Sequence, residues 1–590
     1  MRREGLVLVG VTALALCAPT SASAVADDLR IHDIQGATRL SPHDGEQVSG
    51  VQGIVTAVRA FGSARGFWIQ DSTPDGDRAT SEGLLVFTGS ESPQVAVGDQ
   101  VMVAGTVEEY YPDGPPDAAV HQSTTELVGA TWTVESSGHA LPEAEVLDVP
   151  RDLTADGDIE SPRLRPHRYA LDYYESLEGM RVRVDDAPVV GPTTQYNEVW
   201  LTSRPRENRT ARGGVLYSGY RADNTGRIKV ESLIPFSQRP FPQANVRDTL
   251  AGETSGPLDY DEFGGYVIQA TALGEIEAGG LRPETTRRQR DGELAVGTYN
   301  VENLAPTDPA AKFQRLAQGV VENLASPDIL SLEEIQDDNG ATDDQVVTAG
   351  QTLQRFVDAI VAAGGPRYEW RQIDPVAGAD GGQPGGNIRV AFLFDPSRVS
   401  FTDRPGGDAT TPVSVVDRHL SVSPGRINPA SEAWADSRKP LAGEFTFRGR
   451  TVFVVANHFN SKGGDEPLYG RHQPPSRSSE TQRIAQAKEV RQFVDQLPRR
   501  ANVVVLGDMN DFQFAPALDE LTPRLTDLID LLPRGERYSY IYEGNSQTLD
   551  HVLVAGQIAR LDYDVVHVNA EFANQTSDHD PQVVRLTLAG

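Results

Sequence analysis

Residues 502–511 read NVVVLGDMND, an apolar run that ends in a glycine followed directly by Asp508. Consecutive apolar residues bounded by polar ones are typical of a strand buried on both faces. Similar runs lie at 294–299, 329–332, 390–394 and 452–456. Apolar residues with helical spacing lie between these runs, as at Phe313, Leu316 and Val320. This alternation predicts an α/β domain of about three hundred residues from residue 293 to the end of the chain.

Polar residues stand at the edges of these apolar runs. They are Asn300 in TYNVEN, Glu334 in LSLEEIQ, His458 in VVANHFN, Asp508 and Asn510 in GDMND, Asp550 in LDHVLV, and Asp578 and His579 in SDHDP. Side chains at the carboxyl ends of strands leave the core, and sites form there. Asp550 and Asp578 precede strands instead, so they share that edge only if the sheets contain antiparallel strands. A single Asp or Asn after a strand is usually a turn former, but the whole set supplies carboxylates, imidazoles and amides.

The motifs that carry these residues resemble, in their order, those of the endonuclease/exonuclease/phosphatase superfamily. The resemblance covers the chain from about residue 294 to the end. It implies a four-layered α/β sandwich, in which two β-sheets lie face to face with helices outside and the site lies at one edge. It also implies a Mg²⁺-dependent phosphodiester hydrolase, with Mn²⁺ or Ca²⁺ as possible alternatives.

By this resemblance, Glu334 is the principal metal ligand, and Asp578 and Asp508 lie nearby. His458 and His579 contact the scissile phosphate, one to stabilise charge or protonate the leaving oxygen and the other to help activate water. Asp550 orients His579. A carboxylate partner fixes the imidazole tautomer and raises its pKa.

The resemblance also assigns the phosphate contacts. Asn300, Arg438 and Lys462 are expected to bind phosphate, while Asp508 and Asn510 position the attacking water and a phosphate oxygen. The sequence departs from the family pattern at Ile388, where a Glu that steadies the first histidine is expected. The partner of His458 is therefore open, with Glu333 or water as candidates.

The front half of the chain has short alternating runs broken by Gly, Pro and Asp, which predicts β-structure. We expect an OB-like β domain at 31–145, a second β-rich region at 149–274 and a linker at 275–292. Phe67 and Trp68 are a candidate stacking platform, although one of two adjacent strand residues points into the core of a barrel. LEGMRVRV at 177–184 echoes VGDQVMVAG at 97–105, which suggests a weak internal repeat.

The first 24 residues predict a signal peptide cleaved near Ala24, with Arg2 and Arg3 ahead of an apolar run and a small-residue cleavage site. Cys17 is the only cysteine, so a cleaved protein forms no disulfide-linked partner. No later segment predicts stable membrane insertion. The net charge of -31 argues against a generic basic nucleic-acid coat but not against a nuclease, whose cation supplies positive charge locally.

Together these observations favour a secreted, Mg²⁺-dependent endonuclease that cleaves DNA, and possibly RNA, with little sequence preference and leaves 5′-phosphate ends. The chain resembles the large extracellular bacterial nucleases of the superfamily, which join an OB-like region to the catalytic domain. Two alternatives are a secreted phosphodiesterase acting on phospholipid head groups and an inactive extracellular binding protein. The oligomeric state is open.

Overall fold

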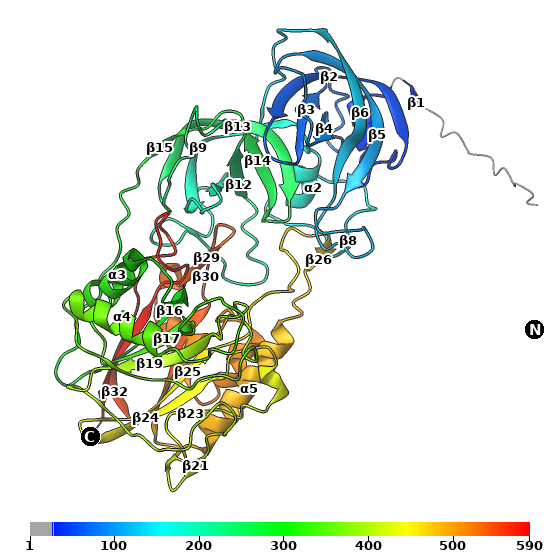
Figure 1. The fold of residues 1–590 in the computed structure, drawn as a ribbon. Coiled ribbons are helices and arrows are strands. Elements are labelled where there is room, and N and C mark those ends of the chain that lie inside the picture. Colours follow the sequence, from blue (N-terminus) through cyan, green and yellow to red (C-terminus); the bar gives the residue numbers. More distant parts are fainter. Residues whose placement is uncertain (1–25, 28, 590) are drawn as a thin grey trace, which may run out of the picture.

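The computed structural model describes the chain except for residues 1–25, 28 and 590. The predicted signal peptide and Cys17 therefore lie outside the described residues. The chain forms a β half, blue to green in Figure 1, and an α/β half, green to red. In the described part, no helix has the length and apolar character needed to cross a membrane.

The first β unit is a closed barrel. Its strands are β2 (Gln47–Arg59), β3 (Arg65–Gln70), β4 (Gly83–Gly89), β5 (Gln100–Tyr110) and β6 (Thr124–Ser136), with β1 (Ala26–Asp27) beside β2 and α1 (Ile31–Gln35) between them in the chain. The sheet order is β2-β3-β4-β6-β5, and β5 pairs back onto β2. Phe67 and Trp68 are 0% and 1% exposed, so both belong to the packed interior and the candidate stacking platform is wrong.

The second β unit repeats this topology. Its elements are β7 (Glu145–Val146), α2 (Ala170–Glu175), β9 (Arg181–Gly191), β10 (Val199–Thr202), β12 (Arg227–Ser232), β13 (Thr249–Asp261), β14 (Gly265–Ala270) and β15 (Glu275–Glu277). The order β9-β10-β12-β14-β13 closes through β13 and β9, and β12–β14 is parallel as β4–β6 is in the first unit. The sequence echo nevertheless joins non-equivalent strands, because 97–105 leads into β5 and 177–184 into β9. The first three residues of the segment expected to be linker form β15.

The α/β half is built on two large sheets. The first runs in the order β18 (Glu369–Arg371), β19 (Arg389–Phe394), β17 (Ile329–Ile335), β16 (Leu294–Leu304), β33 (Gln582–Leu588) and β32 (Ile558–Val565). The second runs in the order β20 (Ser400–Phe401), β24 (Leu441–Phe447), β25 (Arg450–His458), β27 (Asn502–Asp508), β31 (Asp550–Ala555) and β28 (Thr526–Asp527), and β23 (Gly425–Arg426) also pairs with β24. Both sheets mix parallel and antiparallel pairs.

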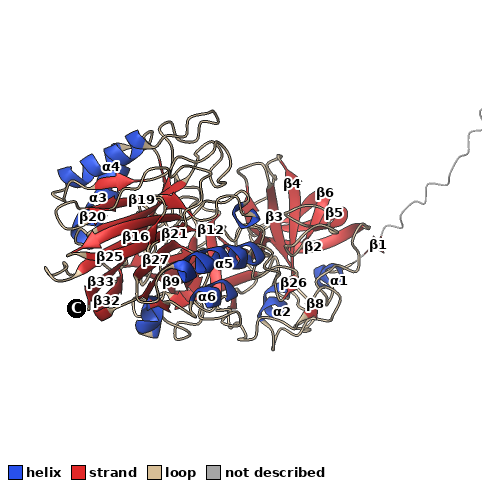
Figure 2. Ribbon diagram, turned by 90° about the horizontal axis from the view of Figure 1, so that it is seen from below, coloured by secondary structure: helices blue, strands red, loops and turns tan. Residues whose placement is uncertain are grey.

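Strand alternation explains the layers. Leu294 and Val296 point into the core between the sheets, whereas Ala295 and Tyr299 pack against helices. The helices are α3 (Ala310–Gln318), which continues as a π-helical turn η1 (Gly319–Asn323), α4 (Gly350–Ala362), α5 (Glu480–Gln496) and α6 (Pro516–Leu521). The α3–α4 pair covers the first sheet and the α5–α6 pair covers the second, on opposite outer sides in Figure 2. This is the expected four-layered α/β sandwich.

Short elements complete the α/β half and join it to the β half. They are β8 (Gly157–Asp158), β11 (Val215–Leu216), β21 (Val415–Val416), β22 (His419–Leu420), η2 (Glu432–Trp434), β26 (His472–Gln473), η3 (Leu528–Leu531), η4 (Arg534–Glu536), β29 (Tyr540–Tyr542) and β30 (Asn545–Gln547). Strand β11 of the β half pairs with β30, and β8 pairs with β26. Tyr469, in the loop that follows β25, is 3% exposed and belongs to the core of the second β unit.

Candidate active site

The register of the strands brings the predicted residues to one edge of the sandwich. His458 lies opposite Asp508 in the parallel pair β25–β27, and Asp508 lies opposite Asp550 in the antiparallel pair β27–β31. In the other sheet, Asn300 lies opposite Glu333, the neighbour of Glu334. Because β31 is antiparallel to β27, Asp550 at its start lies at the same edge as Asp508 and His458 at the ends of their strands. The condition stated for Asp550 in the sequence analysis is therefore met.

The Asp508 carboxylate is central to this group. Its Oδ2 accepts a hydrogen bond of 3.2 Å from Asn300 Nδ2 and lies 3.5 Å from His458 Nε2 and 3.7 Å from His579 Nε2. Asp508 is 1% exposed. One buried carboxylate oxygen therefore faces an amide and both predicted imidazoles.

Glu334 is held by an unusual local backbone. Its φ of 63° lies in the left-handed region, which residues with side chains rarely adopt. Asn300 Nδ2 donates to its Oε1 at 3.0 Å, and the Asn303 backbone N–H donates to its Oε2 at 2.9 Å. Two donors from the C-terminal part of β16 thus fix the carboxylate at the end of β17.

The donor set fits a divalent cation. Ligand atoms of Glu334, His458 and Asp508 lie within 4.8 Å of one another. Burial raises the pKa of Asp508 to about 7, and the nearby carboxylates of Asp550 and Glu334 contribute to the rise. A buried carboxyl that is costly to ionise beside other carboxylates is typical of a place where a cation supplies the missing charge. Oxygen-rich donors suit Mg²⁺.

His579 and Asp550 form a close pair. His579 Nδ1 lies 2.7 Å from Asp550 Oδ2, and the Ser539 hydroxyl donates to the same oxygen at 2.7 Å. Burial alone would lower the pKa of His579, but Asp550 and Asp508 outweigh it and hold this pKa well above its ordinary value. The imidazole is therefore oriented by Asp550 and favoured in its protonated form.

His458 is in the opposite electrostatic situation. Burial holds its pKa well below the ordinary value, and the charges of Arg438 and His579 lower it further. Its Nδ1 is buried and has no hydrogen-bond partner among the described residues. Glu333 instead accepts hydrogen bonds from Thr298 and Ser331, at 2.9 and 2.5 Å. The suggestion that Glu333 is the partner of His458 is therefore wrong.

The remaining predicted residues surround this centre. Asp578 Oδ1 lies 3.9 Å from His579 Nε2, and the Asp578 side chain is 37% exposed. Its oxygens do not join the group formed by Glu334, His458 and Asp508 in the described part of the chain. Asn510 has a left-handed φ of 49°, and its side-chain amide donates to the Phe459 carbonyl at 3.1 Å.

The two predicted phosphate-binding cations have protein partners. Arg438 is 4% exposed and donates to the Phe459 carbonyl at 2.6 Å. Lys462 lies 2.7 Å from Asp511 Oδ1 and 4.0 Å from the centre of the Phe512 ring. Arg438 lies on the loop before β24 and Lys462 on the loop after β25, and their contacts hold the segments that follow His458 and Asp508 in place.

Two residues of the site were not predicted from the sequence. Burial raises the pKa of Glu302 to about 7, with Asp578 and Glu334 as nearby negative charges. The ring centre of Tyr540 lies 4.8 Å from that of His579. Glu302 lies within the TYNVEN motif, so the motif could have identified it as a site residue, whereas no motif surrounds Tyr540.

A buried network joins the site to the β half. Arg212 Nε donates to Glu571 at 2.7 Å, and the Tyr538 hydroxyl donates to the other Glu571 oxygen at 2.7 Å. Tyr538 stacks on His567 with 4.1 Å between ring centres, and His567 Nδ1 lies 2.9 Å from Asp580 Oδ2. Asp580 follows His579 directly, so an arginine of the β half supports the loop that carries the second imidazole.

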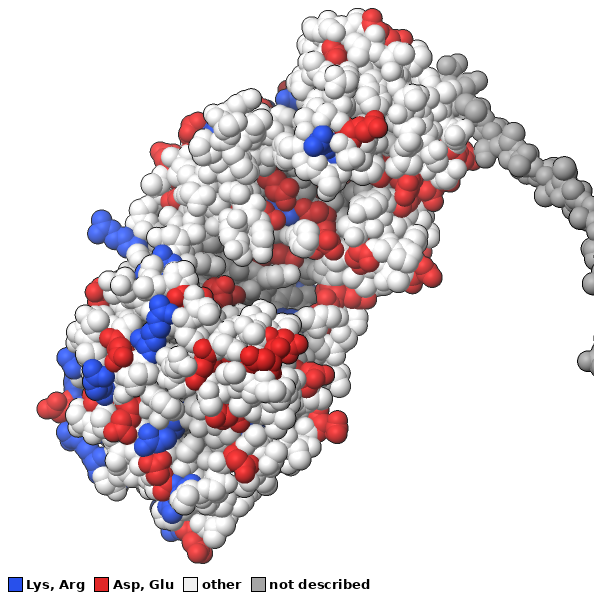
Figure 3. Space-filling model, viewed as in Figure 1, with Lys and Arg blue, Asp and Glu red and all other residues white. Residues whose placement is uncertain are grey.

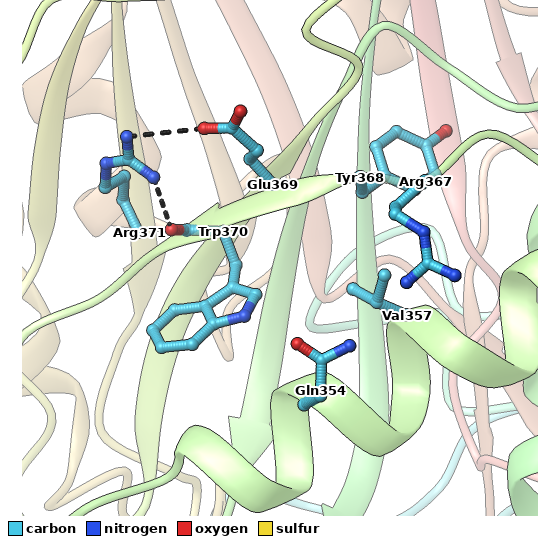
Figure 4. A pocket seen from close by; sticks show the side chains of 7 residues that line it. All are labelled: Gln354, Val357, Arg367, Tyr368, Glu369, Trp370 and Arg371. Carbon is cyan, nitrogen blue, oxygen red and sulfur yellow. Dashed lines mark hydrogen bonds and ion pairs between the residues drawn. The ribbon is translucent and has the colours of Figure 1, made fainter.

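A separate surface hollow lies away from these residues. It is lined by Gln354, Val357, Arg367, Tyr368, Glu369, Trp370 and Arg371, between α4 and the edge strand β18 (Figure 4). Its arginines already have acidic partners, because Arg371 pairs with Asp403 and Arg367 pairs with Asp358. The hollow shares no residue with the strand-edge group, so we assign it no part in the site.

Comparison with known proteins gives two family matches. Residues 134–278 match a domain of unknown function, DUF8508, and residues 297–579 match the Endonuclease/Exonuclease/phosphatase family. No curated protein matches the chain.

Solved structures resemble the C-terminal half. A humanized TDP2 from D. rerio is 17% identical, with a TM-score of 0.33, and the match covers 50% of this chain and 99% of that one. An endonuclease/exonuclease/phosphatase from Bacteroides vulgatus is 15% identical, with a TM-score of 0.32 and coverage of 50% and 99%. The human Nocturnin catalytic domain is 14% identical, with a TM-score of 0.33 and coverage of 51% and 96%.

The family match spans the segment from β16 to the SDHDP motif, and it includes each strand end that contributes to the site. Residues 297–579 therefore form a domain of the Endonuclease/Exonuclease/phosphatase family.

Proposed function

We propose that this protein is a secreted, metal-dependent endonuclease that hydrolyses phosphodiester bonds of nucleic acid, chiefly DNA, with little sequence preference. The observation that carries the proposal is the position of Asp508 Oδ2, within 3.2 to 3.7 Å of Asn300, His458 and His579. Carboxylates, imidazoles and an amide at one point are the groups that hydrolysis of a phosphodiester requires.

Glu334 and Asp508 would hold Mg²⁺, with Asp578 at the exposed side of the site. When bound, Mg²⁺ would neutralise negative charge on the phosphate and polarise its oxygen. Asn300 orients Glu334 and Asp508 through its two hydrogen bonds, at 3.0 and 3.2 Å. Asn510 keeps the turn after β27 closed because its backbone N–H donates to Asp508 Oδ1 at 2.8 Å.

The two imidazoles have different roles because their surroundings differ. A water positioned by Asp508 and Asn510 attacks the phosphorus in line and gives its proton to the Asp508 carboxylate. His579, held protonated by Asp550 and Asp508, gives its Nε2 proton to the leaving 3′ oxygen, so the bond to that oxygen breaks and a 5′-phosphate end remains. His458 is favoured in its neutral form and can donate from Nε2 to a phosphate oxygen as charge develops. The opposite pKa shifts give the two imidazoles different protonation states, so that His579 acts as the acid and His458 as a neutral hydrogen-bond donor.

The β half consists of two barrels with the same strand order. We assign an OB-like fold to the first barrel, supported by the closed order β2-β3-β4-β6-β5 and the parallel pair β4–β6. The second unit has the same order and receives the same assignment. Secretion rests on the signal-like residues 1–24.

Nicking of supercoiled plasmid by the purified mature protein tests the function. We expect Mg²⁺-dependent nicking that EDTA abolishes and that His458→Ala reduces at least a hundredfold, the lower end of a general acid or base contribution. His419→Ala is the matched control, because His419 is 49% exposed and lies outside the site. Intact plasmid with folded protein and several divalent metals would overturn the proposal, and a phospholipid substrate tested in parallel would identify the head-group phosphodiesterase.

A further inference from the structure

An aromatic surface leads away from the catalytic histidine. Tyr540 and Tyr542 are two residues apart on β29, so their side chains lie on the same face of the strand. The Tyr540 ring lies 4.8 Å from the His579 ring, whereas Tyr542 is 53% exposed. The aromatic face therefore begins with Tyr540 at the catalytic imidazole and reaches the protein surface at Tyr542, two residues further along the strand.

The second β unit contacts the turn that follows these tyrosines. A Cβ on Gly191 would lie 3.0 Å from the Cα of Gly544, in the turn between β29 and β30. A Cβ on Gly264 would likewise lie 3.8 Å from Cγ of Glu543. Phe263, next to Gly264 on the β13–β14 hairpin, is 68% exposed. We call Tyr540, Tyr542 and Phe263 the aromatic strip.

The charge around the strip is negative. Lys229 is fully buried and pairs with three carboxylates, those of Glu198, Glu231 and Asp261, at 3.4, 3.1 and 2.5 Å. Figure 3 shows acidic side chains on the walls of the hollow between the two halves. This surface therefore offers a ligand aromatic faces and few cationic contacts for phosphates.

These features distinguish the two forms of nucleic acid. A duplex carries one negative charge per about 1.7 Å of its axis and hides the faces of its bases inside the stack. A single strand exposes its base faces, and stacking on an aromatic side chain contributes about 1–3 kcal/mol per base. Resting on the proposed function, we propose that the aromatic strip binds unpaired bases next to the scissile phosphate, so the preferred substrate is single-stranded nucleic acid.

Direct binding tests this inference separately from catalysis. Fluorescence anisotropy in a His458→Ala background with Mg²⁺ compares a labelled oligothymidylate with a duplex of equal length. We expect the single strand to bind at least about tenfold tighter, and Tyr542→Ala or Phe263→Ala to weaken its binding about 5- to 100-fold. Tyr542→Trp keeps a stacking face and should retain tight binding.

The control is Phe61→Ala, because Phe61 is also an exposed aromatic residue, at 47%, but lies on the first barrel. Thermal unfolding confirms that each variant is folded. Equal affinity for single strand and duplex, or unchanged single-strand affinity in both alanine variants, would overturn the inference. Hydrolysis of bis-p-nitrophenyl phosphate by the unmodified protein reports on catalysis alone, so failure of the proposed function and failure of the strip give different results.

Discussion

Asp508 and Asp550 lie directly opposite each other on the antiparallel strands β27 and β31, and the ring of His579 lies between their carboxylates. Asp550 Oδ2 is 2.7 Å from Nδ1 of the ring, while Asp508 Oδ2 is 3.7 Å from Nε2. The first carboxylate orients the imidazole, and the second connects it to Glu334 and His458. One cross-strand pair thus links the proton-transferring side of the site to the cation-binding side.

Replacing the shared carboxylate tests this link. We expect Asp508→Asn to lower kcat at least a hundredfold and to weaken Mg²⁺ binding measured by calorimetry, because the charge that attracts the cation is lost. Asp358→Asn is the matched control, since the Asp358 side chain is 57% exposed and its partners Arg367 and Gln354 lie outside the site. Normal Mg²⁺ affinity in the Asp508 variant would contradict the assignment of this residue as a ligand.

Ser539 is a positioning residue for the Asp550–His579 pair. Ser539→Ala removes a buried donor to Asp550, and hydrogen bonds to charged groups contribute about 1.5–3 kcal/mol. We expect kcat to fall about tenfold or more with KM nearly unchanged, because the defect affects the imidazole and not substrate binding. Thr548→Ala removes a donor to the Arg537 carbonyl from the same region and should leave kcat unchanged. Equal losses in both variants would indicate a general structural effect.

Arg212 is expected to stabilise the junction of the two halves. Arg212→Gln leaves Glu571, which is fully buried, without its cationic partner, and such a loss costs about 3–5 kcal/mol. We predict a lower thermal midpoint together with reduced activity. The double variant Arg212→Gln, Glu571→Gln removes the unpaired charge and should regain part of the stability. A double variant less stable than the single variant would contradict an electrostatic cause.

Three buried carboxyls between the β units predict a pH-dependent stability. Burial raises the pKa of Glu175 to about 8, holds that of Glu178 well above 4.5, and raises that of Glu109. Between pH 4.5 and about 8 the folded state therefore keeps protons that the unfolded chain releases. The free energy of unfolding falls as pH rises through this window, by about 1.4 kcal/mol per pH unit for a carboxyl that stays protonated across it, and Glu178 and Glu109 act in the same direction.

Scanning calorimetry across that window measures the effect. Glu178→Gln is the informative variant, because an amide oxygen can still accept the hydrogen bonds from the Thr125 backbone N–H and Gln35 Nε2. We expect its melting temperature to depend less steeply on pH than that of the unmodified protein. Identical pH profiles would exclude Glu178 as a contributor.

The strand ends of the catalytic domain were predictable because each joins a long apolar run to a polar residue with restricted chemistry. Asn300, Glu334, His458 and Asp508 follow this rule, and the strand registers place them together. Ser539, Tyr540 and Arg212 carry no such local signal. Their contacts join segments far apart in the chain, 359 residues in the case of Arg212 and Glu571. The prediction failed for Phe67 and Trp68, because aromatic residues in a sequence do not reveal which face of their strand is buried.

Because of Tyr469, the linker at residues 278–292 does not separate two independently folded halves. The loop after His458 inserts this tyrosine into the core of the second β unit. Gln122 Nε2 of the first barrel and the Tyr260 hydroxyl of the second unit donate to its backbone carbonyl at 2.7 and 3.1 Å. A truncation at the linker would therefore leave one fragment with a hole in its core and the other with an exposed aromatic ring beside its catalytic loop. The two halves are separate stretches of sequence, but each depends on the other to complete its fold. A change in the β half can therefore alter the loop that follows His458.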